Sequence, residues 1–186
     1  MPPSAQVNEQ PQEVKKTPLQ SISQGACLPG IPKHPTFALK RQWQLEQMAL
    51  AFRVFARLGY TDDSKCQVHF GMLRASDMIL VDYQGVPIGA ALGTKGKTLI
   101  LQNHGLLKTG TTVDEACFLM TLMERASQCQ LLAEAVAAAN GIPKVLISDA
   151  SAKYTFENSS DPETLYWEGQ PDLEYEEYLC KGEHKL

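Results

Sequence analysis

The longest regular pattern in this sequence is a helix-favouring run that begins at Thr112 and continues to about Ala139. Thr112 and Glu115 have the three-residue spacing of a capping box, which satisfies free N–H groups at a helix start. The run ends at Asn140-Gly141, where a glycine commonly stops a helix. Apolar residues recur along one side, so we expect this helix to cover part of a larger core. They are Val113, Ala116, Met120, Met123 and Ala126.

A second strong helical pattern occupies residues 37–59, after the opening Pro35-Thr36. Gly59 lies where a C-terminal glycine stop is expected. Apolar side chains recur at three- and four-residue steps, which predicts an amphipathic helix with one side in the core. This predicted core side consists of Leu45, Met48, Ala49, Phe52, Phe55 and Ala56.

The region between the two helices predicts short strands rather than further helices. Compact apolar runs at residues 78–81 and 98–101 are typical of buried strands. The residues at 83–85 predict a turn, and the glycine-rich residues 89–96 show almost no sign of regular structure. We therefore expect a sheet between the helices, with a loop before its last strand.

Composition limits the classes of function. The chain has 186 residues, of which 44% are hydrophobic, enough for one domain with a real core. Its net charge of -4 argues against nucleic acid or anionic membranes as partners, since both need basic patches. The first 16 residues contain no apolar run typical of a secretory signal. We therefore expect a cytoplasmic protein.

The cysteines predict no disulfide framework. They number five, are scattered, and include no CxxC pair. In the cytosol we expect them to be reduced thiols. Cys117 and Cys129 fall within the long helical pattern, where small, partly buried apolar residues are the expected interpretation.

The chain divides into three parts by composition. Residues 1–35 are rich in Pro, Gln, Ser and Lys and predict a flexible arm, or alternatively a strand or loop that clamps a neighbouring subunit. Residues 36–141 carry the main domain. Residues 142–186 contain helix starts at Ser148-Asp149 and Asp161-Pro162, followed by an acidic, aromatic stretch. This stretch predicts a helical extension that lies on the main domain or on a partner, and a solvated acidic tail fits it equally.

The most informative motif follows the predicted strand at residues 98–101. It reads Gln102-Asn103-His104-Gly105. A strand fixes the backbone before His104, and a glycine after it permits a tight turn with open access. Imidazole binds zinc and other first-row metals. Taken alone, a histidine at such a corner is more often a hydrogen-bonded structural group than a metal ligand.

With the following helix, residues 98–134 resemble the class II aldolase/adducin family. The likeness includes the Asn-His-Gly corner, the Thr109-Gly110 turn and the capped helix through Glu124-Arg125. Residues 37–59 and 69–85 resemble the N-terminal portion of the same domain. The segments 142–144 and 160–166 resemble an extension found in fungal members.

This resemblance implies an α/β fold, an α/β/α sandwich around a mostly antiparallel sheet, here incomplete and with a C-terminal helical extension. It also implies a homo-oligomer, usually a tetramer. Enzymes of the family use a divalent metal, commonly Zn2+, to cleave or form carbon–carbon bonds in small hydroxy-carbonyl substrates. The metal is held by a His-x-His pair and by the histidine of the Asn-His-Gly corner, which His104 matches. A role in a fungal small-molecule pathway follows as an expectation.

This sequence departs from the family pattern at the other ligands. It contains no His-x-His, since its four histidines are isolated at positions 34, 69, 104 and 184. Family segments are missing after Tyr60-Thr61 and between Gly93 and the 98–101 strand. Catalytic zinc sites typically have three protein ligands, so His104 alone is insufficient. No carboxylate matches the acid/base. Asp62 and Asp63 are expected turn residues, while capping and solvation account for Glu115 and Glu124.

Three interpretations follow. The chain is a metal-dependent lyase if its sequence comes from a gene model that skipped internal segments. It is a non-catalytic interaction module if it resembles the adducin branch. It is a remnant without selected activity if neither holds. In each case we expect an incomplete sheet with unpaired edges, and hence reduced stability.

Overall fold

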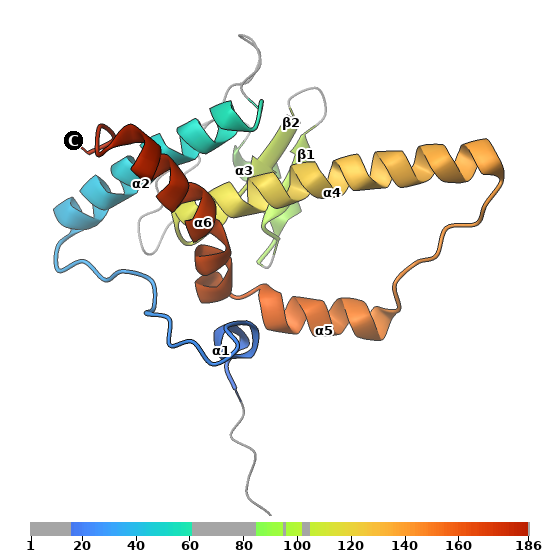
Figure 1. The fold of residues 1–186 in the computed structure, drawn as a ribbon, viewed down its shortest axis with the longest axis horizontal. Helices are drawn as coiled ribbons and strands as arrows, with labels where there is room; N and C mark the ends of the chain where they lie inside the picture. The colour runs from blue at the N-terminus through green and yellow to red at the C-terminus, as the bar shows by residue number, and fades with distance from the viewer. Residues whose placement is uncertain (1–15, 61–84, 95, 102–104, 186) are drawn as a thin grey trace, which may run out of the picture.

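The computed structural model describes residues 16–60, 85–94, 96–101 and 105–185, and these form a mostly helical fold with one antiparallel strand pair (Figure 1). The strand expected at residues 78–81 lies outside these ranges. The elements in chain order are α1 (Pro18–Ile22), α2 (Phe37–Arg57), α3 (Gly85–Leu92), β1 (Thr98–Leu101), β2 (Gly105–Lys108), α4 (Val113–Asn140), α5 (Asp149–Ser159) and α6 (Pro162–Cys180).

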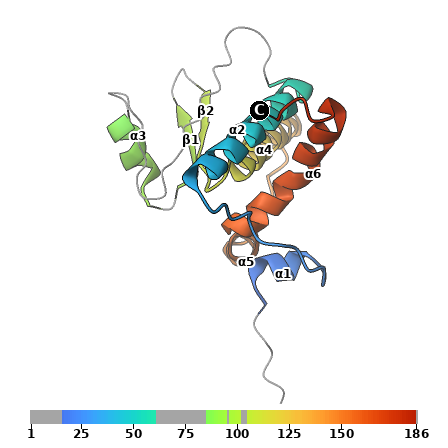
Figure 2. The same ribbon diagram turned by 90° about the vertical axis from the view of Figure 1, so that its left-hand side faces the viewer.

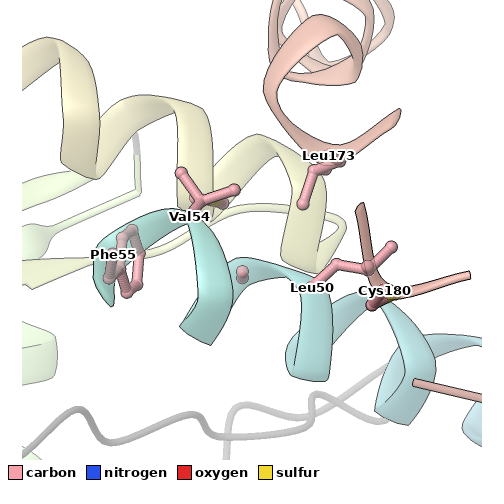
Figure 3. Packing of buried hydrophobic residues seen from close by; sticks show 7 residues of the cluster. Leu50, Val54, Phe55, Leu173 and Cys180 are labelled. Carbon is pink, nitrogen blue, oxygen red and sulfur yellow. The ribbon is translucent and has the colours of Figure 1, made fainter. Parts of the chain in front are cut away.

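The core lies where α2, α4 and α6 pack together (Figure 3). Helix α2 begins because the Thr36 side chain accepts a hydrogen bond from the Leu39 N–H at 3.2 Å. The predicted core side of α2 is only partly correct. Phe55 is buried, but Phe52 and Ala56 are exposed, because the partners of α2 are two helices whose positions the sequence does not reveal. The core cluster consists of Leu50, Ala51, Val54, Phe55, Cys117, Leu173 and Cys180.

Helix α6 lies against α2 and α4 and is not a solvated tail. Asp161 accepts hydrogen bonds from the Glu163 and Thr164 N–H groups, and so caps the helix at the predicted start. Its acidic residues pair with α2, since Glu176 accepts from Arg57 at 2.5 Å. Its apolar residues enter the core. Most of the charge of α6 therefore faces outward or is paired, while the helix helps to build the domain.

The sheet of the described residues is a single hairpin of two strands, β1 and β2. Thr98 lies opposite Lys108, and Leu101 opposite Gly105. The hairpin and α3 lie on one side of the three-helix core (Figure 2). The part of the chain that the structure describes thus has an incomplete α/β fold, in which a full sandwich around a sheet is not formed. The prediction that residues 89–96 have almost no regular structure is wrong for residues 89–92, because α3 continues to Leu92. Gly93 follows the helix with a φ of 61°.

Helix α4 packs over its first half only. Its N-cap is Thr112, as predicted, and Gly141 ends it in a left-handed conformation with a φ of 63°. The buried residues of α4 all belong to its first turns, and the last of them is Thr121. Beyond them the helix extends away from α2 and α6 (Figure 1). An apolar run long enough to cross a membrane occurs in none of the helices within the described ranges.

The ends of the chain also contact the body. Within the range expected to be an arm, α1 contacts α5, and the Trp167 indole donates to the Pro29 carbonyl at 2.7 Å. The division of the chain after residues 35 and 141 stays a prediction.

Candidate functional site

The predicted metal ligand, His104, lies outside the described residues, together with Gln102 and Asn103. The structure describes the strands on both sides of it. It also describes the base of the hairpin, where β1 and β2 meet the start of α4. The role of His104 stays a prediction, and the chemistry that can be built from contacts lies at this base.

A buried carboxylate, Glu115, joins the hairpin to α4. Its side chain has no exposed surface. One oxygen accepts from Lys97 Nζ at 2.5 Å, and the other accepts from the Thr111 N–H at 2.6 Å and the Thr111 hydroxyl at 2.8 Å. Charge-assisted hydrogen bonds of this kind are about twice as strong as neutral ones. Glu115 therefore holds the start of β1 against the start of α4.

Of the two roles expected for Glu115, capping is found in part and solvation is wrong. Its N–H donates to the Thr112 hydroxyl at 3.1 Å, which is the predicted cap. Its carboxylate, however, is neither solvated nor returned to the Thr112 backbone, because Lys97 and Thr111 take both oxygens. No pattern in the sequence indicates this contact, since Lys97 precedes β1 and its approach to Glu115 depends on the fold of the hairpin.

Lys97 extends this junction to a third segment. It also donates to the Ser160 carbonyl at 3.0 Å, at the connection between α5 and α6. The space is tight, because a Cβ at Gly110 would lie 2.9 Å from the Ala116 nitrogen. The hairpin, the start of α4 and the start of α6 are thus held together by one ion pair, whose carboxylate is fully buried and whose lysine is partly exposed.

Asp114, the neighbour of Glu115, is buried on the opposite side, between α2, α4 and α6. Its Oδ1 accepts from Gln170 Nε2 at 3.0 Å, while its Oδ2 has no hydrogen-bond partner among the described residues. Burial raises the pKa of Asp114 to about 6. No pattern in the sequence predicted this group, because a carboxylate beside a helix cap is usually solvated.

Metal ligands do not gather in the part of the chain that the structure describes. No three or more His, Cys, Asp or Glu residues there could hold an ion together. The two described histidines have other neighbours: His34 stacks on Trp43 with ring centroids 4.9 Å apart, and His184 contacts Cys180. His69 lies outside the described ranges.

The second half of α4 and the segment after it carry large apolar side chains that stay exposed. We call this set the distal face. A hollow of about 560 Å³ lies between its two parts, lined by residues of α4 and of the segment 142–146. Glu134 and Lys144 form an ion pair at its edge. The distal face consists of Leu131, Leu132, Val136, Ile142, Val145, Leu146 and Ile147.

One comparison with known proteins matches the segment around the hairpin, and another matches most of the chain. The sequence model described as the Class II Aldolase and Adducin N-terminal domain matches residues 85–131. The "Meiotically up-regulated gene 14 protein" of Schizosaccharomyces pombe is 24% identical over 257 residues, which cover 87% of this chain and 99% of that protein. Since this alignment is longer than the chain itself, the S. pombe protein contains residues without a counterpart here.

Two further likenesses are partial or structural. Gamma-adducin of Rattus norvegicus is 33% identical over 81 residues, which cover 39% of this chain and only 11% of that protein. The structure of L-fuculose 1-phosphate aldolase from Glaciozyma antarctica PI12 superposes with a TM-score of 0.63 at 19% identity, over 84% of this chain and 97% of that chain. The second likeness is one of fold.

Proposed function

Because the chain belongs to the class II aldolase and adducin N-terminal domain family, we propose that it is an assembly module of that family, which binds a second copy of itself through the distal face. In this proposal the chain does not hold the complete three-histidine metal site. The sequence supports this, because His104 has no His-x-His pair to share an ion with.

The observation that carries the proposal is the exposure of the distal face. Val145 is 97% exposed, Leu146 83% and Leu131 70%. Single exposed apolar residues are common, but a group of large ones on adjoining segments usually marks a surface that binds another protein. Covering each such side chain stabilises a complex by about 1.5–3 kcal/mol before the costs of association.

A second copy of the chain is the occupant that the charges favour. Glu134 and Lys144 border the hollow with opposite signs, so the same surface on a second copy can meet it with charges matched. A two-fold interface needs this self-complementarity, because each patch contacts its own equivalent. The hollow between α4 and the segment 142–146 can accept apolar side chains from that copy.

The experiment compares oligomeric state across matched variants. We expect the purified protein to self-associate in sedimentation velocity or light scattering, and we expect Leu132→Glu with Val145→Glu to yield monomers. Tyr178→Glu is the control, since Tyr178 is 77% exposed but lies on α6. A wild-type protein that stays monomeric at high concentration would contradict the proposal, as would equal dissociation by the control.

A metal-dependent lyase is the second candidate function. It is favoured by the fold likeness to an L-fuculose 1-phosphate aldolase and by the family match across the hairpin. The substrate would be a small hydroxy-carbonyl compound and the ion Zn2+ or another divalent metal, with His104 as a ligand. The donor set of this chain fits such an ion poorly, because the motif supplies one imidazole where three are needed.

Metal analysis separates the two candidates. Stoichiometric zinc in the purified protein that is lost in His104→Ala, together with aldol cleavage that requires it, would establish the lyase. Sequencing the transcript between the codons of Tyr60 and Gly96 tests the alternative of skipped segments. If the transcript encodes only these residues and the purified protein holds no zinc, the lyase is excluded and the assembly module remains.

A further inference from the structure

We propose that Cys180, His184 and Glu177 form a thiol-exchange site at the C-terminal end of α6, where Cys180 forms mixed disulfides with small disulfide compounds. The Cys180 Sγ lies 3.1 Å from His184 Nδ1. The other ring nitrogen, Nε2, lies 3.8 Å from Glu177 Oε1. A thiol, a base and a carboxylate thus lie together over residues 177–184, the last turn of α6 and the residues that follow it.

The order of the three groups assigns their roles. With a hydrogen on Nε2, which faces the Glu177 carboxylate, Nδ1 has a free lone pair directed at the thiol. His184 can then accept the thiol proton, and the Glu177 carboxylate stabilises the imidazolium that results. The same nucleophile, base and orienting acid recur in thiol enzymes of unrelated folds, which shows that the arrangement suffices to activate a sulfur.

The site is covered but weakly held. Cys180 is 3% exposed and His184 7%, so only a small reagent can reach the sulfur after the last turn opens. That turn contains two residues with positive φ, Lys181 at 50° and Gly182 at 88°. It is held by backbone hydrogen bonds from the Glu183 N–H to the Cys180 carbonyl and from the Lys185 N–H to the Gly182 carbonyl, and by an exposed ion pair between Lys185 and Glu177, which is weak in water. Local opening therefore costs far less than unfolding.

The exchange balances without a further reactant. The Cys180 thiol proton passes to His184 Nδ1, and Sγ attacks one sulfur of the small disulfide. The sulfur–sulfur bond of the reagent breaks, and its second sulfur leaves as a thiolate that takes the proton from His184. Cys180 is oxidised to a mixed disulfide, and the leaving half of the reagent is reduced to a thiol.

Modification would reach the core. Cys180 belongs to the buried cluster that contains Leu50 and Leu173, and it lies beside Leu50 (Figure 3). A group attached to its sulfur overpacks that cluster, and overpacked cores are destabilised. A mixed disulfide at Cys180 would therefore loosen α6 from α2, whereas modification of the exposed Cys27 and Cys129 would not.

The test measures mixed-disulfide formation at each cysteine of the full chain under native conditions. The protein is incubated with oxidised glutathione at neutral pH, and peptides are quantified by mass spectrometry. We expect Cys180 to react faster than Cys117, whose thiol has its pKa raised to about 12 by burial. We expect His184→Gln to slow Cys180 at least about tenfold, since loss of a general base costs a factor of this order or more.

The exposed cysteines provide the internal control. Cys27 and Cys129 should react at the same rate in wild type and in His184→Gln, and Glu177→Gln should slow Cys180 less than His184→Gln does. If His184→Gln merely opened the turn, Cys180 would react faster. That result would overturn the proposal, as would a native protein in which Cys27 and Cys129 are modified and Cys180 is not.

Discussion

The buried Asp114 predicts a stability that falls as the pH rises from acidic to neutral. Its pKa is about 6 in the folded chain, against an ordinary value of 3.8, because burial disfavours the charged form. The folded state therefore binds the proton more tightly than the unfolded state. This contribution to stability is complete below about pH 3.8 and is lost as the pH rises through 6. At neutral pH, Asp114 is charged and buried, and only its Oδ1 accepts a hydrogen bond.

The magnitude follows from the difference between the two pKa values. About two pKa units correspond to about 3 kcal/mol, since one unit is worth about 1.4 kcal/mol. The substitution Asp114→Asn removes the ionisation and keeps an acceptor for Gln170. The new amide nitrogen takes the place of the unpartnered Oδ2 and costs about 1 kcal/mol. We expect the variant to be more stable than wild type by about 2 kcal/mol at neutral pH.

Urea unfolding of both proteins across a pH series is the assay. The difference in the free energy of unfolding should change by about 2 kcal/mol between about pH 4.5 and pH 7.5, with the variant gaining toward neutral pH. Asp149→Asn, at an exposed helix start, is the control and should change stability by only tenths of a kcal/mol. A difference for Asp114→Asn that is constant with pH, or a variant less stable at pH 7.5, would refute the reasoning.

Three further predictions concern the base of the hairpin. Glu115→Ala should lower the free energy of unfolding by about 1.5–3 kcal/mol in thermal or urea unfolding, because it removes the buried carboxylate that accepts from Lys97 and Thr111. Glu134→Ala, at an exposed pair, should cost less than about 1 kcal/mol, and equal losses would contradict this. Burial lowers the pKa of Lys108 to about 8, so at that pH Lys108 should be acylated faster than the exposed lysines in peptide mass spectrometry. A rate equal to theirs or slower would contradict this. Gly110→Ala should lower the free energy of unfolding by about 1 kcal/mol or more, because its Cβ would lie 2.9 Å from the Ala116 nitrogen. Gly89→Ala is the control, since open space surrounds Gly89. A Gly110 variant as stable as wild type would show that the backbone shifts to make room.

The helix ends could be predicted from the sequence because their causes are local. Thr36, Thr112, Ser148 and Asp161 each accept a hydrogen bond from an N–H group two or three residues ahead, and each begins a helix where expected. Helix α3 was missed because its glycines resemble those of a loop. Its existence depends on neighbours that the local pattern does not contain.

The buried faces and the site could be predicted only in part, because they depend on contacts between distant segments. The core side of α2 is set by α4 and α6, and the ion pair of Glu115 is made with Lys97, which precedes β1. The family resemblance was right, since it rested on a contiguous motif. His104 stays a predicted ligand, because it lies outside the described residues.

The packing of α6 on α2 has a consequence for the order of events during synthesis. The ion pair between Arg57 and Glu176 joins residues 119 positions apart, and the core cluster joins the same two helices. While the ribosome is still producing α4 and α5, the apolar residues of α2 lack the neighbours that α6 supplies. The nascent chain must therefore wait for its last helix before the core can close, and contacts this distant along the chain form slowly. A ribosome-bound chain that ends before α6 should remain sensitive to protease and should bind chaperones through α2 until the final segment emerges.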